Sequence, residues 1–270
     1  RKLGTMKLRN SVMNEDMISS AELTRAACCN LGESFVTNPS VDVSYSDAAT
    51  GAKQIKLLGL SGTYVQMMTE NIPNFRGAAA PYGLGYVPGP WMQSIQVSKG
   101  SSSVKNGYES ITGQINVEFK KPQLPEADWV SANLFASSTN RYEANADATV
   151  KLSKRWSTSL LAHYENETKS HDSNDDGFVD IPRVEQYNFW NRWAYMGDHY
   201  VFQAGIKALH ETRNSGQTAH GQTATHDLYE IGIQTNRYEA FTKNAYIFDK
   251  EKNTNLALIL QGTLHNQDAT

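Results

Sequence analysis

The stretch that decides the fold is residues 94–121, SIQVSKGSSSVKNGYESITGQINVEFKK. Apolar side chains alternate with polar ones at both of its ends: Ile95 and Val97 near the start, and Ile115, Val117 and Phe119 near the end. This period of two is typical of half-buried strands. Three glycines lie where the backbone has to turn or approach another backbone closely: Gly100, Gly107 and Gly113. The stretch predicts two strands with a glycine-rich connection between them.

The same residues resemble the C-terminal part of the plug domain of TonB-dependent outer-membrane transporters. In that family a strand ending in Gly is followed by a Ser-Ser-Val-x-x-Gly turn, a second Gly and an Ile-Asn strand that leads into a β-barrel. The corresponding residues here are, in order, Ser94–Gly100, Ser102–Gly107, Gly113 and Ile115–Val117. An ordinary β-hairpin with glycine turns is the alternative, and the sequence that follows favours the plug.

Composition limits the class of protein. The chain has 270 residues, enough for one large or two ordinary domains, and its net charge of −3 gives no sign of a nucleic-acid surface. The mean hydropathy is −0.53, and no run approaches the ~18 apolar residues of a membrane helix, which leaves barrel strands open. The 13 Tyr and 5 Trp are consistent with the aromatic girdles of a membrane barrel and also with a tyrosine-rich soluble β protein. Because the chain begins at Arg1 and ends at Thr270 without evident termini, we expect a fragment, with the TonB-binding segment upstream.

Residues 1–122 predict a small α+β domain. We expect a helix within 18–36, begun by Ser19 or Ser20, and short strands at 41–45, 54–58 and 64–68. The resemblance continues here, since plug domains carry a strand ending in Gly and then a strand closed by an Asp-Gly-x-Pro turn. The corresponding residues are 55–59 and the turn Glu70-Asn71-Ile72-Pro73, and Leu58 stands where the family commonly has Arg.

A long Gly/Pro/aromatic loop follows at residues 74–91. Loops of this length inside a compact domain are usually functional or disordered. The resemblance implies that the loop faces outward and contacts cargo, which makes four residues candidates for cargo binding: Arg76, Tyr82, Tyr86 and Trp91. Packing of the same residues against a barrel wall is an equal alternative. Nucleotide binding is excluded because neither phosphate-loop spacing is present.

The two cysteines are adjacent, Cys28 and Cys29, so no disulfide framework is expected. Together with Met67 and Met68 they could form a soft-metal site. We favour the interpretation that the two cysteines are small buried residues on a helix.

Residues 123–270 predict antiparallel transmembrane β-barrel strands. We expect eight of them, near 129–137, 141–152, 156–167, 186–196, 199–211, 226–237, 240–249 and 254–266. Tight connections are expected at 153–155, at 197–198 and at a corner at 237–239, whereas 168–185 and 212–225 are long and polar. Outer-membrane barrels show this asymmetry of turns and loops. Eight strands enclose too little space for a plug and a plugged lumen needs ~22, so the sequence predicts only the first part of the barrel.

One motif predicts a metal site. In residues 171–182, HDSNDDGFVDIP, the spacing of a calcium loop is met by Asp172, Asn174, Asp176, the Phe178 carbonyl and Asp180, with Gly177 at the turn. Arg183 replaces the expected bidentate Glu. We expect structural Ca²⁺ in a long outer loop, and an acidic solvated loop is the alternative.

The resulting hypothesis is TonB-dependent active transport across the outer membrane of a Gram-negative bacterium, with no catalysis in this chain. The resemblance implies TonB and its inner-membrane energising complex, outer-membrane lipid and a small-molecule or metal cargo as partners, with a surface lipoprotein as a further candidate. The cargo stays open among ferric siderophores, haem, corrinoids, metals and glycans. A soluble calcium-dependent β-sandwich binding module and a β-rich surface hydrolase are the alternatives.

Overall fold

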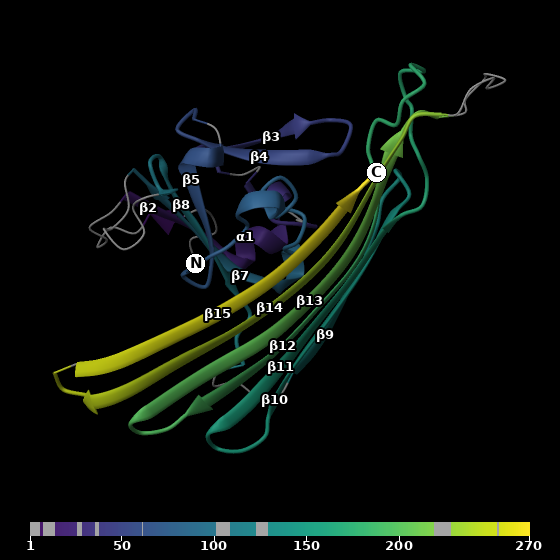
Figure 1. Ribbon diagram of the computed structural model, residues 1–270. Coiled ribbons are helices and arrows are strands. Elements are labelled where there is room, and N and C mark those ends of the chain that lie inside the picture. The colour runs from purple at the N-terminus through teal and green to yellow at the C-terminus, as the bar shows by residue number, and fades with distance from the viewer. Residues whose placement is uncertain are drawn as a thin grey trace. The chain divides into compact units, whose positions relative to one another are not determined.

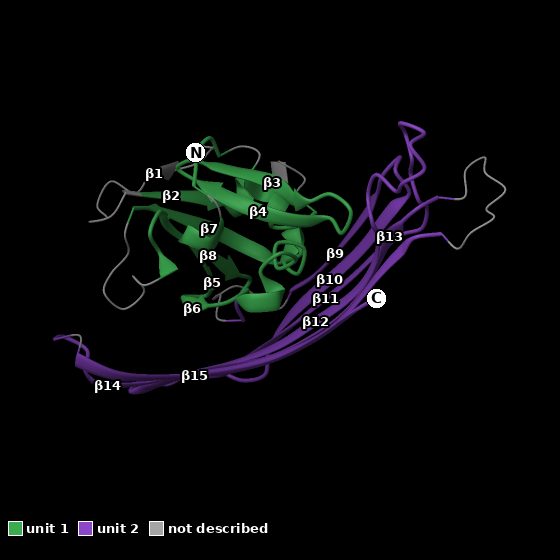
Figure 2. Ribbon diagram, turned by 45° about the horizontal axis from the view of Figure 1, so that its top comes forward, with its two compact units in different colours: residues 1–120 green, residues 121–270 purple. Residues whose placement is uncertain are grey.

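The computed structural model describes residues 6–7, 14–25, 29–35, 38–60, 62–100, 109–122, 129–218, 228–252 and 254–270. The chain divides into two compact units, residues 1–120 and 121–270 (Figure 2). Within the described ranges, no helix is long and apolar enough to cross a membrane.

The N-terminal unit is built mainly from short strands (Figure 1). A six-stranded sheet has the order β1-β2-β7-β8-β5-β6, and β3 and β4 form a separate pair. The strands are β1 Met6–Lys7, β2 Asn14–Ser19, β3 Val41–Asp47, β4 Ala52–Leu57, β5 Val65–Thr69, β6 Ile72–Pro73, β7 Met92–Lys99 and β8 Gly113–Phe119. The helical elements are α1 Ser20–Arg25 and the 3-10 turns η1 Gly32–Phe35, η2 Gly62–Tyr64, η3 Gly77–Ala79 and η4 Gly89–Trp91.

The two strands predicted within residues 94–121 are confirmed as β7 and β8, which pair antiparallel at the centre of the sheet. Ile95 lies opposite Val117 and Val97 opposite Ile115, and all four side chains are fully buried. Gly113 has φ +152°, and a Cβ on it would collide with the Ser98 carbonyl oxygen, so only glycine fits at this close approach. The connection at 101–108 lies outside the described residues.

The helix expected over 18–36 is wrong in extent. Residues 14–19 form β2, which pairs with β7, and the helix that follows covers only Ser20–Arg25. Ile18 is fully buried at this pairing. The expected start at Ser20 is confirmed, and β2 takes only Ile18 and Ser19 from the expected range. The helix falls short at its other end, where Asn30 forms a bridge with Pro88 and Gly32–Phe35 form a 3-10 turn. The strands expected at 41–45, 54–58 and 64–68 are confirmed as β3, β4 and β5.

The C-terminal unit is one curved antiparallel sheet of seven strands, each paired with its neighbour in sequence (Figure 1). The strands are β9 Trp129–Ala136, β10 Arg141–Lys151, β11 Trp156–Glu167, β12 Arg183–Met196, β13 Tyr200–Gly216, β14 Glu230–Asp249 and β15 Thr254–Ala269. The expected count of eight is wrong, because the corner placed at 237–239 does not exist and β14 runs straight through it. Arg237 and Glu239 lie on one face with Tyr238 on the other, paired in register with β13, so alternation continues without a break.

This correction sharpens the asymmetry of the connections. The connections at 152–155, 197–199 and 250–253 follow even-numbered strands and are all short. At the opposite end, the connections 168–182 and 217–229 are long, while 137–140 is short. Short turns at one end and longer loops at the other are typical of outer-membrane barrels.

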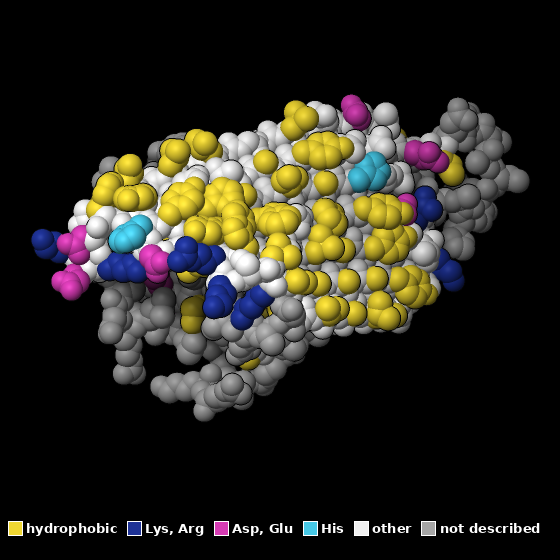
Figure 3. Space-filling view, turned by 90° about the horizontal axis from the view of Figure 1, so that it is seen from below, with side chains coloured by type: hydrophobic (Ala, Val, Ile, Leu, Met, Phe, Trp, Pro, Cys, Tyr) yellow, Lys and Arg dark blue, Asp and Glu magenta, His cyan; other side chains and the backbone are white. Residues whose placement is uncertain are grey.

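Burial in this sheet is inverted with respect to a soluble protein. Along β10 the apolar residues are exposed and the polar ones are buried: Ala144 and Ala146 are exposed, whereas Glu143, Asn145 and Asp147 are at most 5% exposed. Leu258 on β15 is 55% exposed. Figure 3 shows hydrophobic side chains spread over this face of the sheet, with charged ones at its ends and along one edge. A soluble β-sandwich would bury Ala146 and Leu258 between two layers, so that alternative is overturned.

Two rows of aromatic side chains border the apolar face. Near the end with the long loops, Tyr164 lies against Tyr187 and Tyr187 against His210, with ring centroids 5.0 Å and 6.5 Å apart. Near the short turns, Tyr195 lies 5.1 Å from Trp156 and 6.1 Å from Tyr200. Tyr187 and Tyr195 are eight residues apart on β12, or about 26 Å along the strand. For a strand tilted as in membrane barrels, this spacing corresponds to a band about 20 Å tall, close to the ~25 Å apolar band of such barrels.

Polar groups on the convex face are paired within the sheet. Asn191 accepts a hydrogen bond from the Trp193 indole at 2.6 Å and donates to the Ser159 carbonyl at 3.2 Å. The Tyr200 hydroxyl donates to Asn244 at 2.6 Å. Polar groups in hydrocarbon are costly unless they are hydrogen-bonded. These pairs make the face compatible with lipid despite its amides.

Candidate functional site

The candidate site lies in the N-terminal unit, and its position is set by the turn between β5 and β6. Glu70 and Asn71 at this turn have φ values of +52° and +63°, the left-handed region that Asn tolerates well. The Asn71 backbone N–H donates to Asn116 Oδ1 at 2.7 Å, and its side-chain amide donates to Glu118 at 3.2 Å. The sequence prediction that Glu70-Asn71 forms the turn is confirmed. These bonds fix the turn to β8 and direct β6 into the loop at 74–91.

The loop begins at a buried aromatic anchor. Phe75 has φ +55°, is 5% exposed and lies edge-on to Tyr86 with ring centroids 6.5 Å apart. A Cβ on Gly83 would come within 2.6 Å of the Phe75 ring, so glycine is needed where the loop closes over it. The Lys53 N–H donates to the Pro81 carbonyl at 2.9 Å, which ties the loop to β4. The loop is therefore an ordered wall of the domain.

The four predicted cargo residues fall into two groups. Tyr86 and Trp91 are fully buried and pack the core of the domain, so their expected contact with cargo is corrected to a structural role. Arg76 is exposed and forms an ion pair with Glu109 at 2.6 Å, and Tyr82 is half-buried. The second pair keeps side-chain surface for a ligand.

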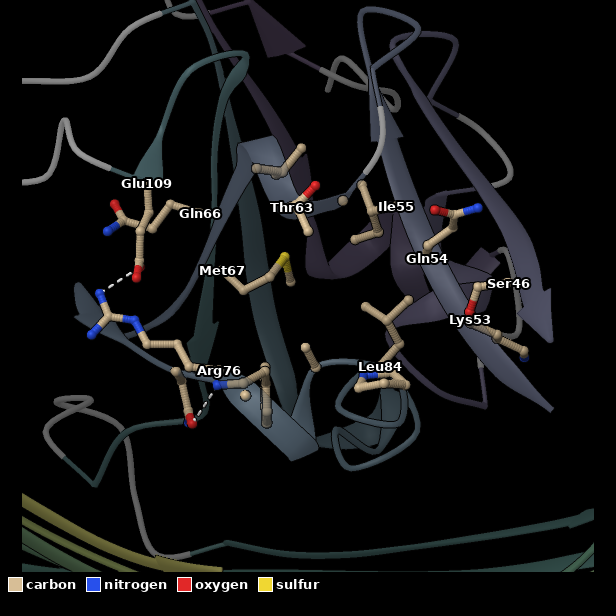
Figure 4. Close-up of a pocket in the computed structure, with 17 residues that line it drawn as sticks. Ser46, Lys53, Gln54, Ile55, Thr63, Gln66, Met67, Arg76, Leu84 and Glu109 are labelled. Carbon is tan, nitrogen blue, oxygen red and sulfur yellow. Dashed lines mark hydrogen bonds and ion pairs between the residues drawn. The ribbon is translucent and has the colours of Figure 1, made fainter. Parts of the chain in front are cut away.

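A pocket of about 430 Å³ opens between the β3–β4 pair, β5 and the loop (Figure 4). Met67 lies at its centre, with Gln66, Glu109 and Arg76 on one side and Ser46, Lys53 and Gln54 on the other. Its apolar lining comes from Ile55, Val65, Phe75, Pro81 and Leu84. The volume falls within the ~300–1,000 Å³ of small-molecule sites.

Sequence reasoning missed most of this pocket. Lys53, Gln54 and Glu109 are far from the loop in sequence and reach the pocket through strand pairing and folding. Gln66 left a signal, because it shares the inward face of β5 with Met68, which is fully buried. A polar side chain on a buried strand face is costly unless it has a hydrogen-bond partner, so its presence in the sequence can mark a site.

The residues expected to bind a soft metal are spread over different environments. Cys28 lies outside the described residues, and the Cys29 side chain is buried. Met68 is in the core, whereas Met67 lines the pocket. In the part of the chain that the structure describes, no group of three or more His, Cys, Asp or Glu side chains could hold a metal ion. The soft-metal site stays a prediction.

The predicted calcium loop is ordered by its own backbone. Asp172 accepts hydrogen bonds from the N–H groups of Asp176 at 3.1 Å and Gly177 at 2.9 Å. Asp176 accepts from the Phe178 N–H at 2.9 Å, and Asp180 from the Ser173 N–H at 2.7 Å. The Ser173 N–H holds the pKa of Asp180 below its usual value.

In these contacts the loop carboxylates accept hydrogen bonds from backbone N–H groups of the same loop. The carboxylates point at loop amides, Asn174 donates to Asp176 at 2.9 Å, and Gly177 has φ +83° as the turn requires. Because the oxygens face amides, the arrangement favours a self-capped acidic loop, and calcium stays a prediction to be tested.

Comparison with known proteins identifies the N-terminal unit. Residues 7–114 match the TonB-dependent receptor plug domain family. The chain contains a TonB-dependent receptor plug domain. The predicted resemblance is thus confirmed, and the sheet after the plug domain has the fold of the corresponding partial barrel. Among curated protein sequences none matches significantly.

Solved structures share the fold of the whole chain. The alcaligin outer-membrane receptor FauA from Bordetella pertussis is 13% identical with a TM-score of 0.76, and the match covers 98% of this chain and 42% of FauA. The ferric-catecholate import receptor Fiu from E. coli K12 is 17% identical with a TM-score of 0.70, covering 95% and 39%. The copper transporter OprC is 12% identical with a TM-score of 0.65, covering 99% and 48%.

The chain therefore spans less than half the length of these receptors. The plug domain and the outer-membrane receptor fold confirm the predicted location in the outer membrane.

Proposed function

We propose that the chain is the plug and first barrel strands of a receptor that imports a ferric siderophore-type cargo in a TonB-dependent manner. The observation that carries the proposal is the inverted sheet, apolar outside and polar inside, that follows a receptor plug domain in the same chain. Likeness to siderophore receptors such as FauA supports the cargo class.

The exposed residues of the plug domain suit such a cargo. Ferric chelates present oxygen atoms and negative charge, and Arg76 offers a permanent positive charge with several donors in a fixed plane. Arg76 keeps 46% of its side chain exposed while paired with Glu109. Tyr82 adds half-buried aromatic surface on the same loop. We therefore assign the chain to transport and expect no catalysis.

Two further partners follow from the proposal. TonB is the energy-transducing partner after which the plug family is named, and we assign it to this receptor. Outer-membrane lipid is the partner of the convex face, because apolar side chains bordered by aromatic rows match hydrocarbon between two interfaces.

Uptake measurements test the proposal. A deletion strain and its complemented parent are compared for uptake of iron-loaded hydroxamate and catecholate siderophores, haem, a corrinoid and copper. We expect uptake of one iron chelate to be lost on deletion and in a strain without TonB. Unchanged uptake of every cargo, or uptake that persists without TonB, contradicts the proposal. Selective loss of copper uptake would instead favour the soft-metal alternative.

A variant separates cargo contact from general damage. Arg76→Ala removes the exposed cation on the plug, and we expect the apparent affinity for the cargo to fall by about tenfold. Arg155→Ala is the matched control, because Arg155 is also an exposed arginine paired with a carboxylate, Asp198, at 2.9 Å. Equal uptake by both variants would remove Arg76 from the cargo site.

A further inference from the structure

The segment that leads into the loop at 74–91 has an unusual backbone. Glu70, Asn71 and Phe75 have φ values of +52°, +63° and +55°, so three residues other than glycine adopt the left-handed region within six positions. This conformation costs free energy for side chains other than Gly and Asn, and it persists only where surrounding contacts impose it. The contacts that impose it here also decide where Arg76, the next residue of the loop, is placed.

The first of these contacts comes from a buried amide on β8. Asn116 is 2% exposed, and its Oδ1 accepts the Asn71 backbone N–H at 2.7 Å. Its Nδ2 donates to Glu118 at 2.8 Å and to Gln96 on β7 at 3.2 Å. Only a side-chain amide can accept one bond and donate two in this way. The Asn116 amide therefore joins the turn to the two central strands of the sheet.

The second contact holds the side chain of the turn. Glu118 Oε1 accepts a hydrogen bond from Asn71 Nδ2 at 3.2 Å in addition to the one from Asn116. The Glu70 N–H donates to the Val117 carbonyl at 2.9 Å. Hydrogen bonds to a carboxylate are stronger than those between neutral groups. Both left-handed residues of the turn are thus bonded to β8, and these bonds form one network with the Asn116 amide.

Further hydrogen bonds continue from the turn toward the loop. The Asn74 N–H donates to the Met67 carbonyl at 2.9 Å, and Asn74 Nδ2 donates to Thr69 at 3.1 Å. Asn74 Oδ1 in turn accepts the Phe75 N–H at 2.8 Å. Phe75 directly precedes Arg76, so the backbone on the N-terminal side of Arg76 is held by bonds that begin at β8. A group that is held in place before binding loses less freedom when a ligand arrives.

We propose that Asn116 and Glu118 are positioning residues for the loop: they hold the Glu70-Asn71 turn in its left-handed form and thereby fix where Arg76 is presented. Asn71 depends on this support, whereas glycine adopts the same conformation without it. The consequence for cargo binding rests on the proposed function, because it requires Arg76 to contact cargo. The ordering of the loop does not.

Trypsin proteolysis of the detergent-purified full protein tests the ordering of the loop, with cleavage sites identified by mass spectrometry. Arg76 is exposed, so the rate of cleavage after it reports how often the loop leaves its ordered position. Lys56 lies on β4, outside the sheet that carries the network, and serves as the reference site. We expect Glu118→Ala to accelerate cleavage at Arg76 by about tenfold, as loss of a hydrogen bond to a charged group implies, without an equal change at Lys56.

Matched variants assign the effect to the turn. Glu118→Gln keeps an oxygen that accepts the same bonds, so its cleavage rate should stay close to that of the parent. Gln96→Ala removes the bond from Asn116 to β7 but leaves both bonds to the turn, and should also behave like the parent. Asn71→Ala keeps the left-handed conformation without the side-chain bond and should accelerate cleavage at Arg76. Asn71→Gly should not, and it should restore the parental rate when combined with Glu118→Ala.

Two results overturn the inference. Acceleration of equal size at Arg76 and Lys56 means that Glu118 stabilises the domain as a whole, and no acceleration means that the turn does not need it. If Glu118→Ala does not fold, the comparison at the exposed Asn71 decides alone. Equal cleavage of Asn71→Ala and Asn71→Gly then overturns the inference.

Uptake of the iron-loaded hydroxamate and catecholate siderophores tests the consequence for cargo. We expect Glu118→Ala to raise the apparent KM of the transported chelate by about tenfold at an unchanged maximal rate, and Asn71→Gly to reverse this. A lower maximal rate at an unchanged KM overturns the role in cargo binding. If the parent transports neither chelate, the proposed function fails, and the proteolysis result still decides whether the network positions the loop.

Discussion

Placing a charge at the middle of the apolar face tests whether the C-terminal unit faces hydrocarbon. Ile206 on β13 lies six residues from Tyr200 and four from His210, the β13 members of the two aromatic rows, and is 67% exposed. It therefore sits near the middle of the apolar band. Arg or Lys at the midplane of a membrane barrel destabilises it by about 2–4 kcal/mol, falling to about 0–1 near the interfaces.

We expect Ile206→Arg to destabilise the folded protein by about 2–4 kcal/mol, which is roughly 30- to 900-fold in the folding equilibrium. Thr212→Arg is the matched control on the same strand and face, six residues away and beyond the His210 row. Its cost should be about 0–1 kcal/mol. Thr263→Arg is a second control, because Thr263 lies opposite Glu239 on the polar face.

The assay is urea unfolding from lipid vesicles, followed by tryptophan fluorescence. A depth-dependent difference between Ile206→Arg and Thr212→Arg supports a lipid-facing sheet. If the two variants lose the same stability, or if Thr263→Arg is the most damaging of the three, the convex face does not contact hydrocarbon and the argument from inverted burial fails.

Three further predictions concern the plug domain and the acidic loop. Gly113→Ala should destabilise the plug domain by about 2–4 kcal/mol, since φ +152° is strained for alanine and its Cβ meets the Ser98 carbonyl. Gly59→Ala is the control for the collision, because Gly59 also has a positive φ (+81°) but nothing lies within 4 Å of its Cβ position. Limited proteolysis should cleave the plug domain earlier in Gly113→Ala than in Gly59→Ala. The depressed pKa of Asp180 gives a contribution to loop stability that is present above its ordinary value of 3.8 and is lost as pH falls through the lower folded pKa. Ser173→Pro removes the donating N–H and should return the pKa of Asp180, measured by NMR titration, toward 3.8. If the loop holds Ca²⁺, calcium titration should show binding, and Asp176→Ala should weaken it. Equal titration curves for the parent and the variant would mean that the loop does not bind the ion and that its carboxylates serve only to accept hydrogen bonds from loop amides.

The strands of the plug domain were predictable because their signals are local. β3, β4, β5, β7 and β8 each alternate in sequence, and turn residues separate them. The helix over 18–36 was overestimated because Asn30 bridges to Pro88, almost 60 positions away, and Gly32–Phe35 form a 3-10 turn, and no local pattern reports that bridge. The corner at 237–239 was predicted although the sequence has no Gly, Pro or Asn there, and alternation alone would have extended the strand.

The candidate site was only partly predictable for a related reason. Arg76 and Tyr82 were found because they lie on one conspicuous loop. Tyr86 and Trp91 come from the same loop yet fill the core, since large aromatic rings stabilise a domain most when they are buried. Gln66 and Glu109, the groups that give the pocket its polar side, join the loop only after β5 and β8 pair.

The remaining step concerns the direction of the alternation, which sequence patterns leave open. Alternation with a period of two shows that the two faces of a strand differ in polarity. The same alternation occurs in a sandwich, which buries its apolar face, and in a membrane barrel, which exposes it. Ala146 therefore supported both hypotheses equally well until its side chain was located. The long polar loops supplied an independent clue, and the exposed position of Ala146 beside buried Asn145 and Asp147 decides the direction. Since a single antiparallel sheet with its apolar side outward is stable only if something apolar covers that side, we expect membrane hydrocarbon to contribute to the stability of this fold.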